Sequence, residues 1–234
     1  MNSQRPLSPS FINKNSLPEA YCIGNVPFGD LEIDVTPAVL IPRSETEILF
    51  EEAVKRIDVK PGQKALDLCC GSGAIGLALK KRLPVLDVTL ADLSNDALNI
   101  AKRNAEKYDL EVNYSHGDFL QAVDKEVFDY IFCNPPYISE SVYETLDSSV
   151  KDHEPKMALV GGKTGLEFYK KLSESIDKVL APGGKLFLEI GYDQGDAVRD
   201  LFSGSCVEKD WSGHDRFVFY EKPSYDMVET CLAH

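Results

Sequence analysis

The strongest constraint on the fold is a regular alternation of short apolar runs and amphipathic helical stretches between Lys64 and Lys222. Apolar runs of strand length recur at 64–70, 85–92, 111–118, 128–134, 185–191 and 215–222. Helical patterns fill most of the intervals between them, at 73–83, 94–108, 165–180 and 192–202. Strands that alternate with helices in this way form a mostly parallel sheet covered on both faces. The sequence therefore predicts an α/β fold with one main domain over residues 44–222.

The segment that leads into this domain carries different signals. Residues 19–43 contain short β-type runs broken by Gly and Pro, which predict a small β-hairpin followed by a linker. Ser44 and Glu47 have the spacing of a capping box, and apolar residues follow at helical intervals. We therefore expect a helix from Ser44 to about Ile57.

The two ends of the chain differ from the middle. The polar connection 208–215 between the last two apolar runs, near Cys206 and Arg216, is too short for a right-handed helical crossover. The last strand should therefore run antiparallel to its neighbours. Residues 1–18 lack periodicity and are expected to form a flexible arm, and residues 223–234 a loose tail or one short helix.

The charge balance limits the class of partner. The chain has 25 Lys and Arg against 38 Asp and Glu, a formal charge of -13. The averaged field of such a protein repels polyanions, so free nucleic acid is a poor partner, whereas a small ligand or a basic protein fits better. No Lys/Arg-rich loop stands out, because the run "KKR" at 80–82 is too short.

Cysteine spacing and hydropathy indicate the compartment. The six cysteines form no C-x-x-C pair and no zinc-type spacing, so we expect reduced thiols and no metal site. No run approaches the ~20 apolar residues needed to span a bilayer, and the N-terminus lacks the apolar core of a signal peptide. We expect a cytoplasmic protein that does not bind membranes and acts as a monomer.

A glycine-rich loop follows the first strand of the main domain. Gly71, Gly73 and Gly76 form a G-x-G-x-x-G at the start of a helix, where missing side chains let the backbone approach a ligand. In open α/β sheets ligands bind beyond the carboxyl ends of the strands, which is where this loop should lie. A glycine triplet is a weak indication alone, and it fits either a dinucleotide or S-adenosylmethionine.

Acidic residues near the ends of the first three strands favour an adenosine-containing ligand. A buried carboxylate at Asp67 would repel a pyrophosphate but suits the cationic amino group of a methionine moiety; alternatively it only accepts bonds from loop amides. Asp92 can accept both ribose hydroxyls, or it caps the next helix, a role that residues 94–95 can already fill. Asp118 and Phe119 could contact adenine, although a purely structural role fits them equally well.

The fourth strand ends in Asn-Pro-Pro-Tyr, residues 134–137. Pro135 and Pro136 have no backbone N–H, so the Pro135 carbonyl and the Asn134 side-chain oxygen can form two convergent acceptors. Such a pair matches the hydrogens of an NH2 group, and Tyr137 adds a flat face for a planar amide or base. Accepting both hydrogens favours the pyramidal, charge-accumulating nitrogen of a methyl transfer. The alternative is that residues 134–137 form only a rigid turn. The combination of this motif with the glycine loop and Asp92 favours a catalytic role.

Together these residues resemble the release factor glutamine methyltransferases, the HemK or PrmC family. The resemblance runs from about Pro18 to Glu221, and the family usually has Pro where Ser44 stands. The similar segments are "LIPRSETE", "DLCCGSGAIGLAL", Asp92, "NPPYI", "EPKMALVGGKTGLEFY" and "DWSGHDRFVF". The resemblance implies a Rossmann-like class I methyltransferase fold with a seven-stranded sheet. It also implies methyl transfer from S-adenosylmethionine to the glutamine amide in the Gly-Gly-Gln loop of peptide chain release factors.

The resemblance also assigns roles to individual positions. Residues implied to bind the cofactor are Asp67, Gly71, Gly73, Gly76, Asp92, Asp118, Phe119 and Asn134. Residues implied to bind the target glutamine are Asn134, Pro135, Pro136 and Tyr137, of which all but Pro136 would be catalytic. Weaker candidates on the substrate side are Arg43 and Glu45, and candidates for the far wall of the pocket are Glu154 and Pro155.

Three other functions fit parts of the sequence. The same chemistry could act on an adenine or guanine amino group in nucleic acid, or on another protein amide. An NAD-dependent oxidoreductase would need a residue for hydride chemistry at the Asn-Pro-Pro-Tyr position, where none stands. A methyltransferase-like adaptor would lack catalysis. Family members normally carry a helical N-terminal domain that grips the release factor, whereas about 18 unpatterned residues precede the hairpin here, so the docking mode is open.

Overall fold

A computed structural model of the protein describes residues 17–224. Its main sheet has seven strands in the order β5-β4-β3-β6-β7-β9-β8. The strands are β3 (Lys64–Leu68), β4 (Asp87–Asp92), β5 (Asn113–His116), β6 (Phe128–Cys133), β7 (Leu180–Glu189), β8 (Cys206–Lys209) and β9 (Asp215–Glu221). Strand β9 is antiparallel to β7 and β8, and the pairs among β3 to β7 are parallel. The predicted seven-stranded, mostly parallel sheet with an antiparallel last strand is confirmed.

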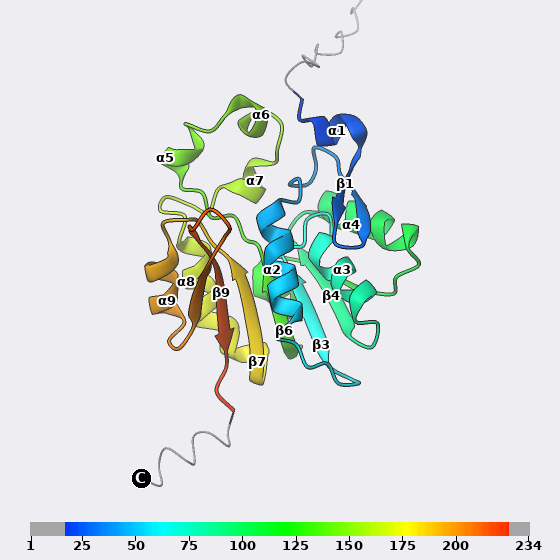
Figure 1. The fold of residues 1–234 in the computed structure, drawn as a ribbon, viewed down its shortest axis with the longest axis vertical. Coiled ribbons are helices and arrows are strands. Elements are labelled where there is room, and N and C mark those ends of the chain that lie inside the picture. The colour runs from blue at the N-terminus through cyan, green and yellow to red at the C-terminus, as the bar shows by residue number, and fades with distance from the viewer. Residues whose placement is uncertain (1–16, 225–234) are drawn as a thin grey trace, which may run out of the picture.

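Two hydrophobic cores lie on the two faces of this sheet. The helices of the first core are α2 (Ser44–Val54), α3 (Ala74–Arg82) and α4 (Asn95–Lys107). The second core contains η1 (Phe119–Val123), α8 (Glu167–Ser175), η2 (Ile176–Lys178) and α9 (Gly195–Leu201). Successive residues of β6 serve opposite faces, since Phe132 is buried in the first core and Ile131 and Cys133 in the second. In Figure 1, α2 lies in front of the sheet.

The expected hairpin forms a separate two-stranded sheet, β1 (Asn25–Phe28) and β2 (Leu31–Asp34), which is antiparallel. It docks on α4 through a buried amide: Asn104 Oδ1 accepts from the Asp34 N–H at 2.8 Å, and Asn104 Nδ2 donates to the Asp34 carbonyl at 3.1 Å. The short helix α1 (Glu19–Ile23) was not predicted. It ends at Gly24, whose φ of 92° closes the turn that feeds β1.

The predicted capping box at the start of α2 is wrong. Arg43 is the N-cap residue, and its side chain makes no hydrogen bond to the first N–H groups of the helix. The Ser44 hydroxyl donates to the Glu45 carboxylate. The Glu47 carboxylate instead accepts the N–H of Gly29 at 2.8 Å, which ties the hairpin turn to the helix. The helix ends at Val54 rather than Ile57 because the last residues form a tighter turn.

The Pro-Gly-Gly stretch at 182–184, between the helical pattern 165–180 and the apolar run 185–191, is part of a strand. It lies inside β7, where Phe128 pairs with Leu180 but Tyr130 pairs with Lys185, so residues 181–184 form a bulge. Three one-turn helices, α5 (Glu140–Tyr143), α6 (Ser148–Lys151) and α7 (Lys156–Leu159), follow β6 and arch over one end of the sheet (Figure 1).

Parts of the expected termini, residues 1–16 and 225–234, lie outside the described range. Within residues 17–224, no helix is both long enough and apolar enough to cross a bilayer.

Candidate active site

A cavity opens at the carboxyl ends of the parallel strands. The strand-end residues in its lining are Asp67, Gly71, Asp92, Asp118, Phe119 and Asn134. Residues from two segments, 38–42 and 155–158, supply the outer wall. The cavity and its solvent-open mouth together enclose about 1050 Å³. The fold thus brings most of the cofactor-side candidates together in one pocket.

The glycine loop has two distinct functions. Gly71 lines the cavity at a φ of 53°, and its N–H donates to Asp92 Oδ2 at 2.9 Å. Gly73 and Gly76 lie outside the lining. A Cβ at Gly76 would stand 2.2 Å from Leu90, and one at Gly73 would stand 3.2 Å from the same side chain. These two glycines let α3 pack closely against β4, and only Gly71 faces the ligand space.

Asp67 is buried on β3, with 3% of its surface exposed, and it lines the cavity. Its Oδ2 accepts the Gly76 N–H at 2.8 Å, so one loop amide is satisfied as the alternative interpretation required. Burial raises the pKa of Asp67 to about 7, because the charged form loses its hydration. A ligand cation that reaches this carboxylate would therefore stabilise its charged form in place of water.

Asp92 braces the loop from the end of β4. Its Oδ1 accepts the Ser94 N–H at 2.8 Å, and its Oδ2 accepts the Gly71 N–H. Burial raises the pKa of Asp92. The α4 helix is capped by the Ser94 hydroxyl, which accepts from Ala97 N–H at 3.2 Å, so Asp92 is not needed as the cap. Each carboxylate oxygen can accept a second hydrogen, which leaves capacity for ligand hydroxyls.

An aromatic wall closes one end of the cavity. Phe119 has a φ of 57° and packs edge-on against Phe168, with ring centroids 4.2 Å apart. Asp118 is paired with Lys171 at 2.9 Å. Phe168 was missed by sequence reasoning, although it lies in the segment "GLEFY" that the resemblance highlighted. Together Phe119 and Phe168 present an apolar surface suited to a flat ring.

The substrate-side candidates Arg43 and Glu45 lie outside the cavity lining. Arg43 is ion-paired with the buried Glu154, which also accepts the Ile41 N–H at 3.1 Å. Glu154 therefore holds the wall segment 38–42 in place and does not itself line the cavity. Pro155 does line it, as expected for the far wall.

Asn134 lies at the junction between the cavity and a buried polar cluster. Its Nδ2 donates to Thr46 Oγ1 at 3.1 Å, and the Thr46 hydroxyl donates to Glu189 Oε2 at 2.6 Å. The Tyr137 hydroxyl donates to Glu189 Oε1 at 3.2 Å. Burial raises the pKa of the Tyr137 phenol far above its usual range, so it stays protonated. Pro136 lines the cavity, whereas Pro135 and Tyr137 lie beside it.

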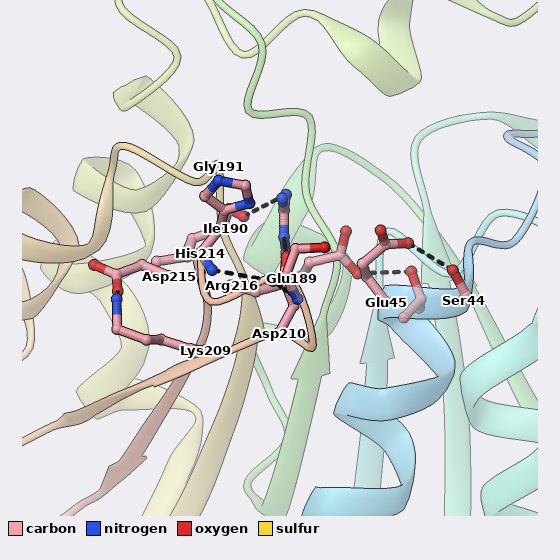
Figure 2. Close-up of polar contacts among 12 residues, drawn as sticks. Ser44, Glu45, Glu189, Ile190, Gly191, Lys209, Asp210, His214, Asp215 and Arg216 are labelled. Atoms are coloured by element: carbon pink, nitrogen blue, oxygen red, sulfur yellow. Dashed lines mark hydrogen bonds and ion pairs between the residues drawn. The ribbon is translucent and has the colours of Figure 1, made fainter.

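Thr46 and Glu189 were not among the sequence candidates. Glu189 is 1% exposed and sits at the end of β7 (Figure 2). An acidic residue that closes the apolar run "KLFLEIG" was the signal that could have identified it. Thr46 gave no comparable signal, because a threonine in the first turn of a helix is common.

The loop between α7 and α8, residues 160–166, packs against the Asn-Pro-Pro-Tyr turn. Gly161 and Gly165 lie against its backbone: added Cβ atoms would stand 2.3 Å from the carbonyl oxygens of Pro136 and Tyr137, respectively. Gln194 Nε2 also donates to the Tyr137 carbonyl at 2.9 Å. The turn is therefore held by close backbone packing, which only glycine permits at these two positions.

Comparison with known proteins gives a consistent result. Residues 44–151 match the family described as "Methyltransferase small domain". The release factor glutamine methyltransferase of Chlamydia trachomatis serovar D is 42% identical over 218 residues, 91% of this chain and 75% of the relative. The enzyme of the same name from Clostridium acetobutylicum is 38% identical over 216 residues, 88% of this chain and 76% of the relative.

Solved structures with the same fold are also methyltransferases. A methyltransferase from Pyrococcus furiosus superposes with a TM-score of 0.62 at 23% identity, covering 88% of this chain and 95% of that one. The Thermus thermophilus 16S rRNA N2 G1207 methyltransferase, solved with AdoMet and guanosine, has a TM-score of 0.61 at 20% identity and covers 85% and 49%. These likenesses show the fold, a class I methyltransferase.

Proposed function

The chain belongs to the release factor glutamine methyltransferase family, and on that premise we propose how its residues methylate the side-chain amide of a release factor glutamine. The reaction depends on S-adenosylmethionine. The observation that carries the proposal is that Asn134 lines the same cavity as Asp67 and Asp92. A hydrogen-bond acceptor for an amide and two carboxylates for a cationic nucleoside therefore share one site.

The residues of the cavity fit this cofactor. Asp67 would receive the cationic amino group and Asp92 the ribose hydroxyls, while Asp118 and Phe119 would lie beside adenine. Gly71, whose Cβ position is open, leaves room for the backbone to approach the ligand. When bound, S-adenosylmethionine supplies a methyl group on a positively charged sulfur atom.

The target amide would be held by acceptors at the end of β6. We assign the Asn134 Oδ1 and the Pro135 carbonyl to the two hydrogens of the glutamine NH2 group. An amide nitrogen is a poor nucleophile because its lone pair is delocalised, and two fixed acceptors stabilise the charge that develops on it. Tyr137, anchored by its hydroxyl on Glu189, would pack beside the amide plane. Asn134 acts by position and dipole and takes up no proton. The methylated nitrogen would release one of its two hydrogens as a proton to water, and S-adenosylhomocysteine would be the leaving group.

The substrate would be the glutamine of a Gly-Gly-Gln loop in a peptide chain release factor. The formal charge of -13 suits a basic protein partner and opposes direct binding of nucleic acid. Arg43 and Glu45 stay candidates for the substrate side, with Arg43 acting through the wall segment that it anchors. We also propose that the protein works in the cytoplasm as a monomer.

The test is incubation of the full chain with purified release factors and S-adenosylmethionine carrying a labelled methyl group, followed by mass mapping of peptides. We expect one label on the glutamine of the Gly-Gly-Gln loop, and none when that glutamine is replaced by alanine. Label on RNA or on another protein amide would overturn the substrate assignment. Calorimetry with S-adenosylmethionine alone distinguishes the enzyme from the remaining alternative, a methyltransferase-like adaptor. An adaptor without a cofactor site would show no binding.

A further inference from the structure

Asn134 can face the substrate in two ways, since rotating its amide by half a turn exchanges an acceptor oxygen for a donor NH2 group. The two ends have opposite effects. The oxygen would attract the hydrogens of the target amide, whereas the NH2 group would repel them. Some feature of the fold must therefore determine which end faces the cavity.

We infer that Glu189 is a positioning residue that fixes the orientation of the Asn134 amide through the hydroxyl of Thr46. The inference rests on the proposed function of Asn134. Three elements contribute: Thr46 comes from the first turn of α2, Asn134 from the end of β6, and Glu189 from the end of β7. The two contacts in series are 3.1 Å and 2.6 Å long.

The direction of each hydrogen bond follows from the acceptor at the end of the series. A carboxylate has no hydrogen to donate, so the Thr46 hydroxyl must give its single hydrogen to Glu189. Thr46 then offers only lone pairs to Asn134, and its partner must be the NH2 group. The Asn134 oxygen is left for the cavity, which is the orientation that the target amide requires.

The surroundings of Glu189 support the carboxylate form. Burial raises its pKa, but hydroxyls from Thr46 and Tyr137 donate to its two oxygens and the positive charge of Arg216 lies nearby. Figure 2 shows Arg216, Asp210 and Glu189 grouped at this end of the sheet. Glu45 is the acidic group that opposes ionisation from the α2 side.

A buried carboxylate is costly for stability, and an apolar side chain would pack here without that cost. The presence of a carboxylate here is explained if one acidic group orients both side chains beside the target amide. Oxygen Oε2 sets Asn134 through Thr46, and oxygen Oε1 holds the Tyr137 hydroxyl directly.

Four variants test this inference. Thr46→Val keeps the shape of the side chain and removes the hydroxyl, and Thr46→Ser restores the hydroxyl. Glu189→Gln keeps the shape but introduces a donor. Tyr169→Phe is the control, because it removes a buried hydroxyl that donates at 2.9 Å to the backbone carbonyl of Glu189 and leaves the series intact.

We expect Thr46→Val and Glu189→Gln to lower kcat for release factor methylation by about 10- to 100-fold, the range for loss of an oriented hydrogen-bonding group. The calorimetric Kd for S-adenosylmethionine should stay within about threefold, since neither change alters a proposed cofactor contact. Thr46→Ser should recover most of the rate, and Tyr169→Phe should keep it. Full activity of Thr46→Val would overturn the inference, as would a Thr46→Ser variant no better than Thr46→Val.

A spectroscopic readout separates this inference from the proposed function. The side-chain NH2 resonances of Asn134, identified by their loss in Asn134→Ala, can be followed in the ¹⁵N-labelled protein without cofactor. They should shift in Thr46→Val and Glu189→Gln but remain in place in Tyr169→Phe. Unchanged resonances in Thr46→Val would show that the hydroxyl does not orient the amide. A wild-type protein that failed to methylate release factors would overturn the proposed function, yet these spectra would still decide the orientation.

Discussion

At the residue scale, the proposed chemistry depends on the carboxamide of Asn134. Replacing Asn134 by alanine removes one of two acceptors for the developing charge but touches no group assigned to the amino acid or ribose of the cofactor. We expect kcat to fall by about a hundredfold or more, with the calorimetric Kd for S-adenosylmethionine roughly unchanged. Asp92→Ala is the matched control, since it should weaken cofactor binding instead. Equal activity of Asn134→Ala and wild type would refute the assigned role.

Asp67 makes cofactor binding dependent on pH. With its pKa raised from 3.8 to about 7 by burial, Asp67 is protonated at acid pH and becomes ionised only near neutrality. If it binds a cationic amino group, affinity for S-adenosylmethionine should rise with pH up to about 7 and fall up to about tenfold per unit below. Above pH ~8 the α-amino group of the ligand loses its own charge, so affinity should decline again. Calorimetry across this range measures the profile.

Asp67→Asn provides the control for that profile. It should weaken binding at neutral pH and flatten the acid limb, because no carboxylate remains to titrate. The same variant has a stability signature. The folded protein holds a proton on Asp67 that the unfolded chain loses near pH 3.8, so the contribution of Asp67 to the free energy of unfolding falls as pH rises from about 4 to about 7. The melting temperature of Asp67→Asn relative to wild type should therefore increase over that window.

At the scale of elements, the loop between α7 and α8, residues 160–166, gives the Asn-Pro-Pro-Tyr turn its rigidity. A side chain at Gly161 would place its Cβ 2.3 Å from the carbonyl oxygen of Pro136, so Gly161→Ala must displace the turn or the loop. We expect a loss of about 1–3 kcal/mol in the free energy of unfolding and a drop of at least about tenfold in kcat.

Gly62→Ala is the matched comparison for this prediction. Gly62 has a φ of 86° in an open turn before β3, so alanine there costs stability without touching the site. Chemical denaturation gives the stability of both variants, and methyl transfer gives their rates. A Gly161→Ala variant that lost stability but kept its kcat would show that the turn tolerates displacement.

The elements and site residues that could be predicted from the sequence are those whose pattern is local to the chain. Buried parallel strands appear as apolar runs and the residues at their ends must meet at one edge, so Asp67, Asp92 and Asn134 could be placed together before the structure was known. The capping box failed because the Glu47 side chain was taken by Gly29, a contact between segments far apart in the fold. Tertiary partners of this kind leave no local pattern.

The same reason explains the missed partners of Asn134. Thr46 is separated from Asn134 by 88 residues and from Glu189 by 143. The pairing of β6 with β7 and the packing of α2 against β7 bring the three residues into contact. A sequence pattern could identify the acceptor at the end of β6 but not the groups that orient it. Likewise, α5, α6 and α7 are one-turn helices whose positions depend on contacts with the rest of the fold.

At the scale of the whole molecule, the net charge of -13 should govern how the substrate approaches. Long-range attraction to a basic protein raises the rate of encounter and is screened by salt, whereas contacts inside the closed site are not. Raising ionic strength from about 0.05 to about 0.3 M should therefore lower kcat/KM for an intact release factor several-fold and leave kcat nearly constant.

A short uncharged peptide that carries the Gly-Gly-Gln sequence separates this field effect from chemistry. It has no extended basic surface, so its kcat/KM should respond little to salt over the same range. RNA supplies the opposite case: a polyanion is repelled by the averaged field, and neither binding nor methylation should be detected even at low ionic strength. If salt raised kcat/KM for the release factor, or if RNA were methylated at low salt, the field around the site would have to be locally basic. A locally basic field would oppose the approach of a basic protein substrate, and nucleic acid would become the stronger candidate.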